Sequence, residues 1–192
     1  MAFVALLVGA LFYAARIPVQ QSAPTRAGPV ERDSDAPIYT AFTLNDIDGT
    51  PREFSEWQGR PRLLNFWATW CAPCRREIPL LKEFQAEQPD DGILIMGIAV
   101  DFAEDVAAYA EAAEFNYPIL VGEQDAMAVA ESSGIEFIAM PFTMVIARDG
   151  RYLGAYLGEL HRGQLNDIAD ILSRLDQGDI DPETASNALK LL

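Results

Sequence analysis

Two cysteines, Cys71 and Cys74, stand two residues apart in the segment LLNFWATWCAPCRREIPLL. The chain contains no other cysteine, so any thiol chemistry must use this pair. A pair at this spacing is compatible with a redox disulfide, half of a metal site, a haem attachment or a structural staple. A disulfide between them closes a very small ring, and loop closure stabilises little at that size. Stapling alone is therefore a poor explanation of the spacing.

The neighbouring residues weaken the other interpretations. A structural zinc site needs about four ligands, and besides the two thiols the chain has a single imidazole, His161. Haem attachment requires histidine after the second cysteine, where Arg75 stands. A peroxide-reducing enzyme is expected to carry threonine three residues before its reactive cysteine, at the position of Ala68; Thr69 is one place off. Redox exchange is favoured, and two inert buried cysteines stay open as an alternative.

Helix geometry explains why this spacing suits exchange. If Cys71 is the N-cap of a helix over residues 72–87, Cys74 lies one turn along on the same face. Cys71 then faces the positive end of the helix dipole and unpaired backbone N–H groups, which favour a thiolate. The thiolate is the nucleophile in disulfide exchange. Pro73 fits the first helical turn, where its missing N–H costs nothing.

The elements that must position the pair follow from the hydrophobic pattern. Apolar runs over residues 63–68 and 92–100 predict buried strands on either side of the helix, in a right-handed parallel unit. The pattern then predicts a helix over 102–115 capped by Asp101, a strand over 117–122, a short helix closed by Gly134, two strands joined through Asp149–Gly150 and a helix from Arg162 to about Leu175.

Composition and charge indicate one globular domain with appendages. The 192 residues carry a net charge of -15, which repels phosphate backbones and argues against nucleic acid as a partner. We interpret residues 1–19 as an N-terminal membrane anchor or uncleaved signal, 20–37 as a flexible tether, 38–175 as the domain, and 176–192 as a C-terminal tail with a short helix from Pro182.

The apolar start of the chain leaves two interpretations open. Its first fifteen residues have no charged side chain. As a helix they rise about 22 Å, against about 30 Å for the hydrocarbon core, and residues 17–19 extend them somewhat. A cleavable signal is the alternative, although a basic start is missing. We expect an anchor; its placement in a bacterial inner membrane, with the domain facing the periplasm or the cell exterior, is what the family resemblance of the motifs below implies.

Two motifs carry a family resemblance. The segment NFWATWCAPCRREIP resembles the active site of the thioredoxin superfamily, and most closely that of the membrane-anchored TlpA/ResA-type thiol-disulfide oxidoreductases. About 70 residues later, MPFTMVIARDG resembles the family's proline-led strand, with Phe142 and Ala147 as departures. The resemblance covers residues 38–175. It implies an α/β, thioredoxin-like fold, a central mixed sheet flanked by helices, with a helix-containing insertion at about 101–135 between the βαβ and ββα halves.

The resemblance also implies roles for individual residues. Cys71 is expected to attack the substrate and Cys74 to resolve the mixed disulfide. Pro141 is expected to follow a cis peptide bond, and Met140 to offer backbone groups to an extended substrate segment. Trp70 is expected to flank the nucleophile as part of the docking surface.

Glu77 is the acid that the resemblance singles out. Classical thioredoxins place a buried aspartate six residues before the nucleophile, where this chain has Asn65, whereas ResA-like relatives use a glutamate at the position of Glu77. Helix spacing puts Cys74 and Glu77 on one face. The alternative is a first-turn acid stabilised by the helix dipole. If Glu77 is buried, we expect its pKa to rise.

The function that follows is extracytoplasmic exchange of dithiol for disulfide through Cys71 and Cys74. By resemblance, the clients are disulfide-containing proteins such as apocytochromes c or copper-centre assembly proteins, and a membrane electron donor restores the dithiol. No cofactor and no metal are expected. A dithiol oxidant or isomerase stays open, because the reduction potential is not readable from these residues. A client-binding or chaperone module on the same fold is the alternative from another class.

Overall fold

The computed structural model describes residue 39, residues 42–132 and residues 139–192. The predicted anchor (1–19) and tether (20–37) lie outside the described residues, as does Gly134. Within the described part of the chain, no helix combines the length and hydrophobicity needed to cross a bilayer.

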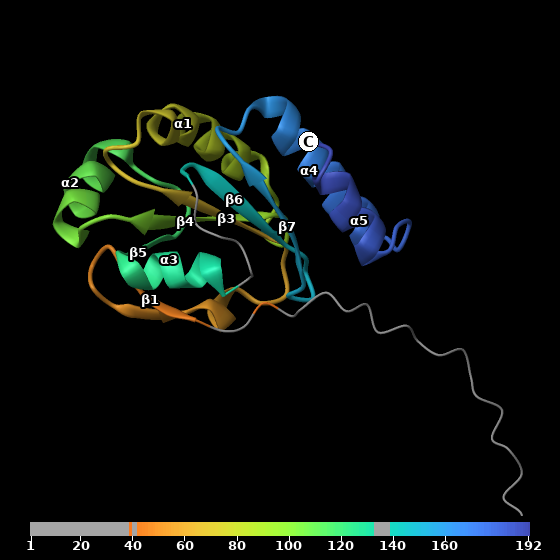
Figure 1. Cartoon of the computed structure of the whole chain (residues 1–192), viewed down its shortest axis with the longest axis horizontal. Coiled ribbons are helices and arrows are strands. Elements are labelled where there is room, and N and C mark those ends of the chain that lie inside the picture. The colour runs from red at the N-terminus through yellow and green to blue at the C-terminus, as the bar shows by residue number, and fades with distance from the viewer. Residues whose placement is uncertain (1–38, 40–41, 133–138) are drawn as a thin grey trace, which may run out of the picture. The chain divides into compact units, whose positions relative to one another are not determined.

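A seven-stranded mixed sheet forms the centre of the fold, in the order β2-β1-β5-β4-β3-β6-β7 (Figure 1). The parallel strands β3, β4 and β5 are neighbours, and every other pairing is antiparallel. The strands are β1 (Thr43–Asp46), β2 (Pro51–Glu53), β3 (Arg62–Trp67), β4 (Leu94–Val100), β5 (Ile119–Gly122), β6 (Phe142–Ile146) and β7 (Tyr152–Leu157).

Helices cover both faces of this sheet, and α1 and α3 lie on opposite sides of it in Figure 1. Residues of α1, α2, α4 and α5 share one buried cluster, which contains both cysteines, whereas α3 and the short 3-10 helix η1 contribute to a second cluster on the other face. This layered α/β arrangement confirms the predicted fold class. The helices are η1 (Phe54–Trp57), α1 (Ala72–Glu87), α2 (Ala103–Ala113), α3 (Gln124–Glu131), α4 (Arg162–Asp176) and α5 (Pro182–Leu189).

Strand β3 connects both clusters, because successive side chains of a strand point to opposite faces. Leu63 and Trp67 belong to the α1 side, whereas Leu64 and Phe66 belong to the α3 side. Asn65 lies between Leu63 and Trp67 in this alternation, and it is 1% exposed. The strand thus carries a polar amide into the apolar layer beneath α1.

The predicted order of elements is confirmed, including the strand expected over residues 117–122 and the short helix expected from Pro182. The segment between β4 and β6 contributes β5 to the sheet as well as the helices α2 and α3. The short helix expected from Pro182 is α5, and its Ala185 and Leu189 are buried in the same cluster as α1. The packed core therefore continues past residue 175.

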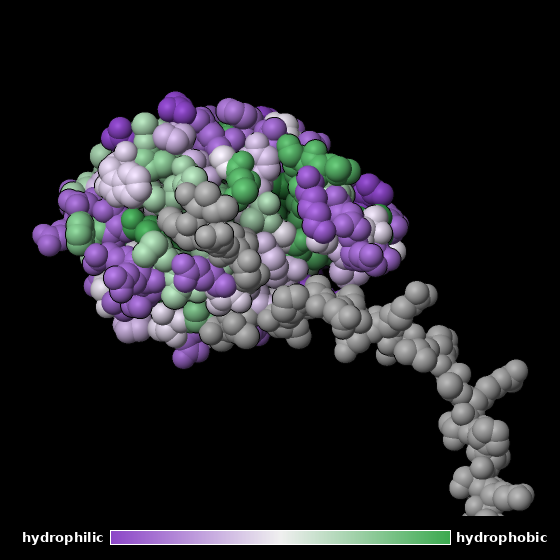
Figure 2. All heavy atoms as spheres, viewed as in Figure 1, coloured by the Kyte–Doolittle hydropathy of each residue, from purple (hydrophilic) through white to green (hydrophobic). Residues whose placement is uncertain are grey.

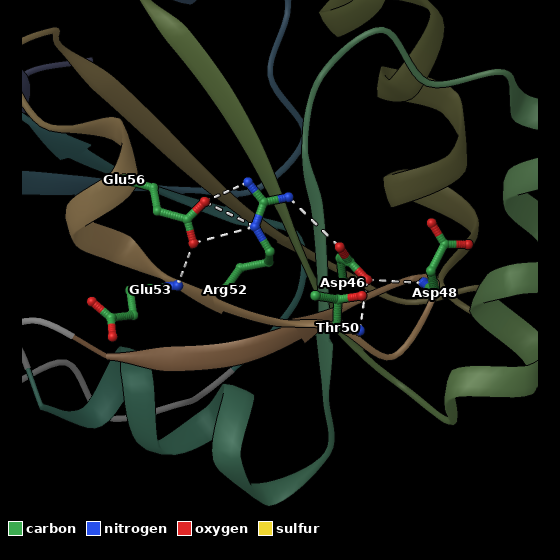
Figure 3. Close-up of polar contacts among 6 residues, drawn as sticks. All are labelled: Asp46, Asp48, Thr50, Arg52, Glu53 and Glu56. Atoms are coloured by element: carbon green, nitrogen blue, oxygen red, sulfur yellow. Dashed lines mark hydrogen bonds and ion pairs between the residues drawn. The ribbon is translucent and has the colours of Figure 1, made fainter.

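The turn between β1 and β2 is held by Asp46 (Figure 3). Its Oδ1 accepts hydrogen bonds from the backbone N–H groups of Asp48 at 3.0 Å and Thr50 at 2.9 Å. Gly49 adopts a positive φ of 79°, a conformation that glycine enters at little cost. This local network is the kind that a short Asp-rich turn favours.

Polar residues dominate the face of the molecule shown in Figure 2. On the face shown in Figure 2, hydrophilic residues spread over the outer sides of the helices, whereas hydrophobic residues gather beside α4. The net charge of -15 is thus carried by a solvated surface.

Candidate active site

The turn from β3 into α1 positions the two cysteines. Cys71 is the N-cap of α1, as predicted, with extended backbone angles (φ -83°, ψ 103°). Its Sγ accepts a hydrogen bond from the backbone N–H of Cys74 at 3.3 Å, and its carbonyl accepts one from Arg75 at 3.1 Å. The two sulfurs are joined in a disulfide. The pair therefore lies at the positive end of the helix dipole.

The two cysteine residues differ in exposure. The Cys71 residue is 6% exposed and the Cys74 residue is fully buried. Cys71 is therefore the cysteine of the pair that is nearer the surface. This asymmetry agrees with the expected order, in which Cys71 attacks and Cys74 resolves.

Glu77 lies one turn beyond Cys74 and is 1% exposed. Its Oε1 accepts a hydrogen bond from Asn65 Nδ2 at 2.8 Å, and its Oε2 accepts one from the backbone N–H of Leu160 at 2.7 Å. Burial outweighs these two bonds and raises the pKa of Glu77 to about 7, with a smaller contribution from the negative charge of Glu159. The carboxyl group can thus change protonation state near neutral pH.

Asn65 ties this carboxyl group to the sheet. Besides Glu77, its Nδ2 lies 3.1 Å from the hydroxyl oxygen of Thr143, which is fully buried on β6. Asn65 and Thr143 are directly paired across β3 and β6. Thr143, the partner of Asn65, and Leu160, the partner of Glu77, were not predicted. They lie 78 and 83 positions away in the sequence, and only strand pairing and loop packing bring them together.

The peptide bond between Met140 and Pro141 is cis, as expected. In the antiparallel register Phe142 pairs with Phe66, so Pro141 falls opposite Trp67, at the edge of the sheet where β3 leads to Cys71. The Pro141 carbonyl accepts a hydrogen bond from Gly158 at 2.9 Å, and Met140 packs half-buried against the cluster that contains the cysteines. Their role in docking stays a prediction.

The predicted helix cap at Asp101 is wrong. The N-cap of α2 is Phe102, and no side chain caps it. The Asp101 carboxylate instead accepts hydrogen bonds from the backbone N–H of Thr69 at 2.9 Å and from its hydroxyl at 2.6 Å. Because β3 and β4 are parallel and in register, the loops that follow them meet here. Asp101 therefore anchors the loop that presents Trp70, which is 68% exposed.

We expect Asp101→Ala to lower the free energy of unfolding by about 1–3 kcal/mol, because it leaves the Thr69 donors without their acceptor. Urea denaturation of the oxidised protein measures the change. Glu111→Ala, at an exposed position of α2, is the matched control and is expected to stay within about 0.5 kcal/mol of wild type. Equal stability of Asp101→Ala and the control would contradict the anchoring role.

Three other polar residues, His161, Arg76 and Thr69, lie outside any group of metal ligands in the part of the chain that the structure describes. Among the described residues, no three His, Cys, Asp or Glu side chains lie close enough to hold a metal ion. His161 is the N-cap of α4 but makes no side-chain cap. Arg76 pairs with Glu159 on the surface, and the Thr69 hydroxyl is bound to Asp101.

Comparison with known proteins finds a family model and relatives that are similar to this chain in sequence. Residues 35–151 match the model of the AhpC/TSA family. The thiol-disulfide oxidoreductase ResA of Geobacillus thermodenitrificans is 31% identical over 111 residues, and the match covers 57% of this chain and 62% of the relative, less than two thirds of its length. ResA of Bacillus thuringiensis subsp. konkukian is 26% identical over 145 residues, covering 74% of this chain and 79% of the relative.

Solved structures share the fold. A thiol:disulfide interchange protein of the thioredoxin family from Chlorobium tepidum TLS is 24% identical, with a TM-score of 0.62. The match covers 73% of this chain and 98% of that chain. At this identity the likeness shows the arrangement of the elements, and the chemistry has to be argued from the site itself.

Proposed function

Because the chain belongs to the AhpC/TSA family and is a thioredoxin-superfamily protein of the ResA/TlpA type, we propose that it is an extracytoplasmic thiol-disulfide oxidoreductase. The observation that carries the proposal is the Cys71–Cys74 disulfide at the head of α1, one turn from a buried carboxyl group. The relatives' names support the reaction class.

In the reductive direction, the Cys71 thiolate attacks one sulfur of a client disulfide. A bond forms between Cys71 Sγ and that sulfur, the client S–S bond breaks, and the other client sulfur leaves as a thiolate that takes up a proton. The helix N-terminus stabilises the Cys71 thiolate before attack. The greater exposure of Cys71, 6% against none for Cys74, supports its assignment as the sulfur that meets the client.

Cys74 then completes the exchange. Its thiol loses a proton and attacks Cys71 Sγ, which forms the intramolecular disulfide and releases the second client sulfur as a thiol. The client gains two electrons and two protons, and the Cys71–Cys74 dithiol loses them. Glu77, with a pKa of about 7, is suited to accept the Cys74 proton and return it when the protein is reduced again.

We further propose that the clients are apocytochromes c or copper-centre assembly proteins, that a membrane electron donor restores the dithiol, and that residues 1–19 anchor the protein in the inner membrane through the tether 20–37. The charge-free apolar start and the ResA-type resemblance support this placement. N-terminal sequencing of the native protein tests the anchor, and a mature chain that starts near Gln20 would refute it.

The reduction potential of the Cys71–Cys74 pair decides whether the protein reduces or oxidises its clients. Equilibration with dithiothreitol is expected to give a value near the about -270 mV of thioredoxin, together with reduction of insulin and of apocytochrome c. A value near about -120 mV, typical of a strong oxidant, would reassign the protein as a dithiol oxidant. Client binding that persists in a Cys71→Ser/Cys74→Ser variant, without exchange by the wild type, would favour the binding-module alternative.

Trp70→Ala is expected to slow reduction of protein clients about tenfold, which corresponds to about 1.4 kcal/mol of binding, while exchange with glutathione disulfide stays unchanged. The reason is that Trp70 is 68% exposed beside Cys71 and contributes contact area only to a large partner. Stopped-flow kinetics with a protein client and with glutathione disulfide measure the two exchange rates and their ratio. Leu191→Ala, which removes another exposed apolar side chain, is the control. Equal losses with both substrates would exclude a docking role.

A further inference from the structure

Arg62, the first residue of β3, is a buried cation with no carboxylate partner among the residues that the structure describes. The residue is 1% exposed, and its Nε has no hydrogen-bond partner. No ion pair joins it to another described residue; the acid that acts on it electrostatically is Asp149, which is itself paired with Arg151 at 3.0 Å. A buried charge is costly unless it is paired, so this position calls for an explanation.

One face of the guanidinium is in contact with an aromatic ring, whereas its Nε lacks a hydrogen-bond partner. The group lies over the ring of Phe54, with 4.4 Å from Cζ to the ring centroid, a cation–π contact. Such a contact involves the flat face, so it does not supply acceptors for the N–H donors in the plane. Burial lowers the pKa of Arg62 to about 10, so the group stays protonated at neutral pH.

A cavity of about 210 Å³ lies next to this side chain. Tyr39 and Phe54 provide aromatic walls, and Ser55 and Gln58 provide polar ones. Arg148 also lines it, but its Nε is bound to Asp176 at 2.9 Å and its Nη1 to the carbonyls of Gly59 and Asp91. Of the charged residues that line the cavity, Arg62 therefore lacks a counter-ion, whereas Arg148 and Asp149 each have one.

A network of polar contacts surrounds the start of η1, the helix that carries Phe54 (Figure 3). Phe54 begins η1, where the Glu56 carboxylate accepts a hydrogen bond from the backbone N–H of Glu53 at 2.8 Å and binds the Arg52 guanidinium with both oxygens. This capping keeps Phe54 under Arg62. This wall of the cavity therefore belongs to a capped helix, and binding sites are usually largely preformed.

We propose that this cavity binds a small organic carboxylate, whose two oxygens pair with the Arg62 guanidinium while its apolar part lies against Tyr39 and Phe54. The planar fork of arginine matches a carboxylate with two parallel hydrogen bonds. The negative charge of Asp149 at the cavity disfavours a phosphate dianion more than a singly charged carboxylate. Aromatic walls favour a ligand that carries an apolar group.

The proposed site is separate from the disulfide. Arg62 and Trp67 mark the two ends of β3, about 16 Å apart at about 3.3 Å per residue, and Cys71 follows Trp67. Their side chains also belong to opposite faces of the sheet. Binding at Arg62 can therefore be measured independently of disulfide exchange, and failure of one proposal leaves the other standing.

Thermal unfolding of the full chain in its oxidised form tests the site, because a ligand of the native state raises the midpoint with a saturable concentration dependence. Benzoate is expected to raise it, whereas benzamide, its uncharged counterpart, and sodium chloride at equal ionic strength are not. Arg62→Met is expected to weaken benzoate binding at least tenfold. Arg174→Met, which removes an exposed arginine on α4, is the control and is expected to keep the full response.

Three results would overturn the proposal: no benzoate response in wild type up to about 10 mM, ten times a millimolar Kd; an undiminished response in Arg62→Met; or an equal response to inorganic phosphate, which would exclude selectivity for a carboxylate. If Arg62→Met does not fold, Arg62→Lys keeps the charge without the fork and is expected to weaken benzoate binding. An unchanged affinity in Arg62→Lys would then contradict the bidentate pairing. Insulin reduction by each variant, expected at the wild-type rate, shows that the active site is intact.

Discussion

Cys71→Ser is expected to abolish disulfide exchange, with a loss of at least about 10³-fold that corresponds to about 4 kcal/mol of activation free energy. A serine hydroxyl stays protonated at neutral pH and cannot replace the thiolate as the attacking group. Because Cys74 is fully buried, it cannot take over the attack on a protein client. Reduction of insulin with dithiothreitol as the electron source measures the loss.

Cys74→Ser is the matched control, because it removes the partner sulfur and keeps the nucleophile. It is expected to attack clients once and to remain joined to them, since nothing resolves the mixed disulfide. Mass spectrometry under non-reducing conditions detects the adduct. Adducts formed by Cys71→Ser through Cys74, with none formed by Cys74→Ser, would reverse the assigned order. Reduced wild type is the reference for stability, because neither variant can close the ring.

Glu77→Gln is expected to remove a large pH dependence of stability from the oxidised protein. Folding raises the pKa of Glu77 from 4.5 to about 7, so the folded state binds the proton more tightly than the unfolded state. The resulting stabilisation is complete below about pH 4.5 and is lost as the pH rises to about 7. The difference between these two pKa values corresponds to about 3 kcal/mol of folding stability, at about 1.36 kcal/mol per pKa unit.

Urea denaturation at about pH 4 and about pH 8 is the direct measurement. Between these values, the free energy of unfolding of wild type is expected to fall by about 3 kcal/mol more than that of Glu77→Gln. Glu83→Gln, at an exposed position of the same helix, is expected to follow wild type. If the free energy of unfolding changed equally with pH in wild type and Glu77→Gln, the buried carboxyl group would not titrate in this range.

The same substitution tests the proposed proton transfer. Glutamine cannot accept the Cys74 proton, so exchange is expected to slow by about 10²-fold and to lose the pH dependence near 7. Rapid-mixing kinetics from pH 5 to 9 resolve both effects. Unchanged rates of exchange and of Cys71 alkylation would rule this role out, while the stability result could still stand.

The elements around the cysteines were predictable because their signals are local. Apolar runs of the right length marked β3 and β4, and the expected helix over residues 72–87 coincides with α1. Asp149 and Gly150 predicted the turn between β6 and β7. The Asp101 cap was wrong because the same side chain could serve α2 or the neighbouring loop, and the register of β3 against β4 selected the loop.

The sequence by itself determined the reactive pair, its place at a helix N-terminus and the turn-to-turn proximity of Cys74 and Glu77, since spacing along a helix sets these relations. Only the tertiary structure decided which groups meet the Glu77 carboxyl group, because Asn65 and Leu160 arrive from other elements. It likewise decided that Arg62 lies unpaired beside a cavity. Burial and strand register set these contacts, and together they determine whether a polar side chain is solvated, paired or left to bind a ligand.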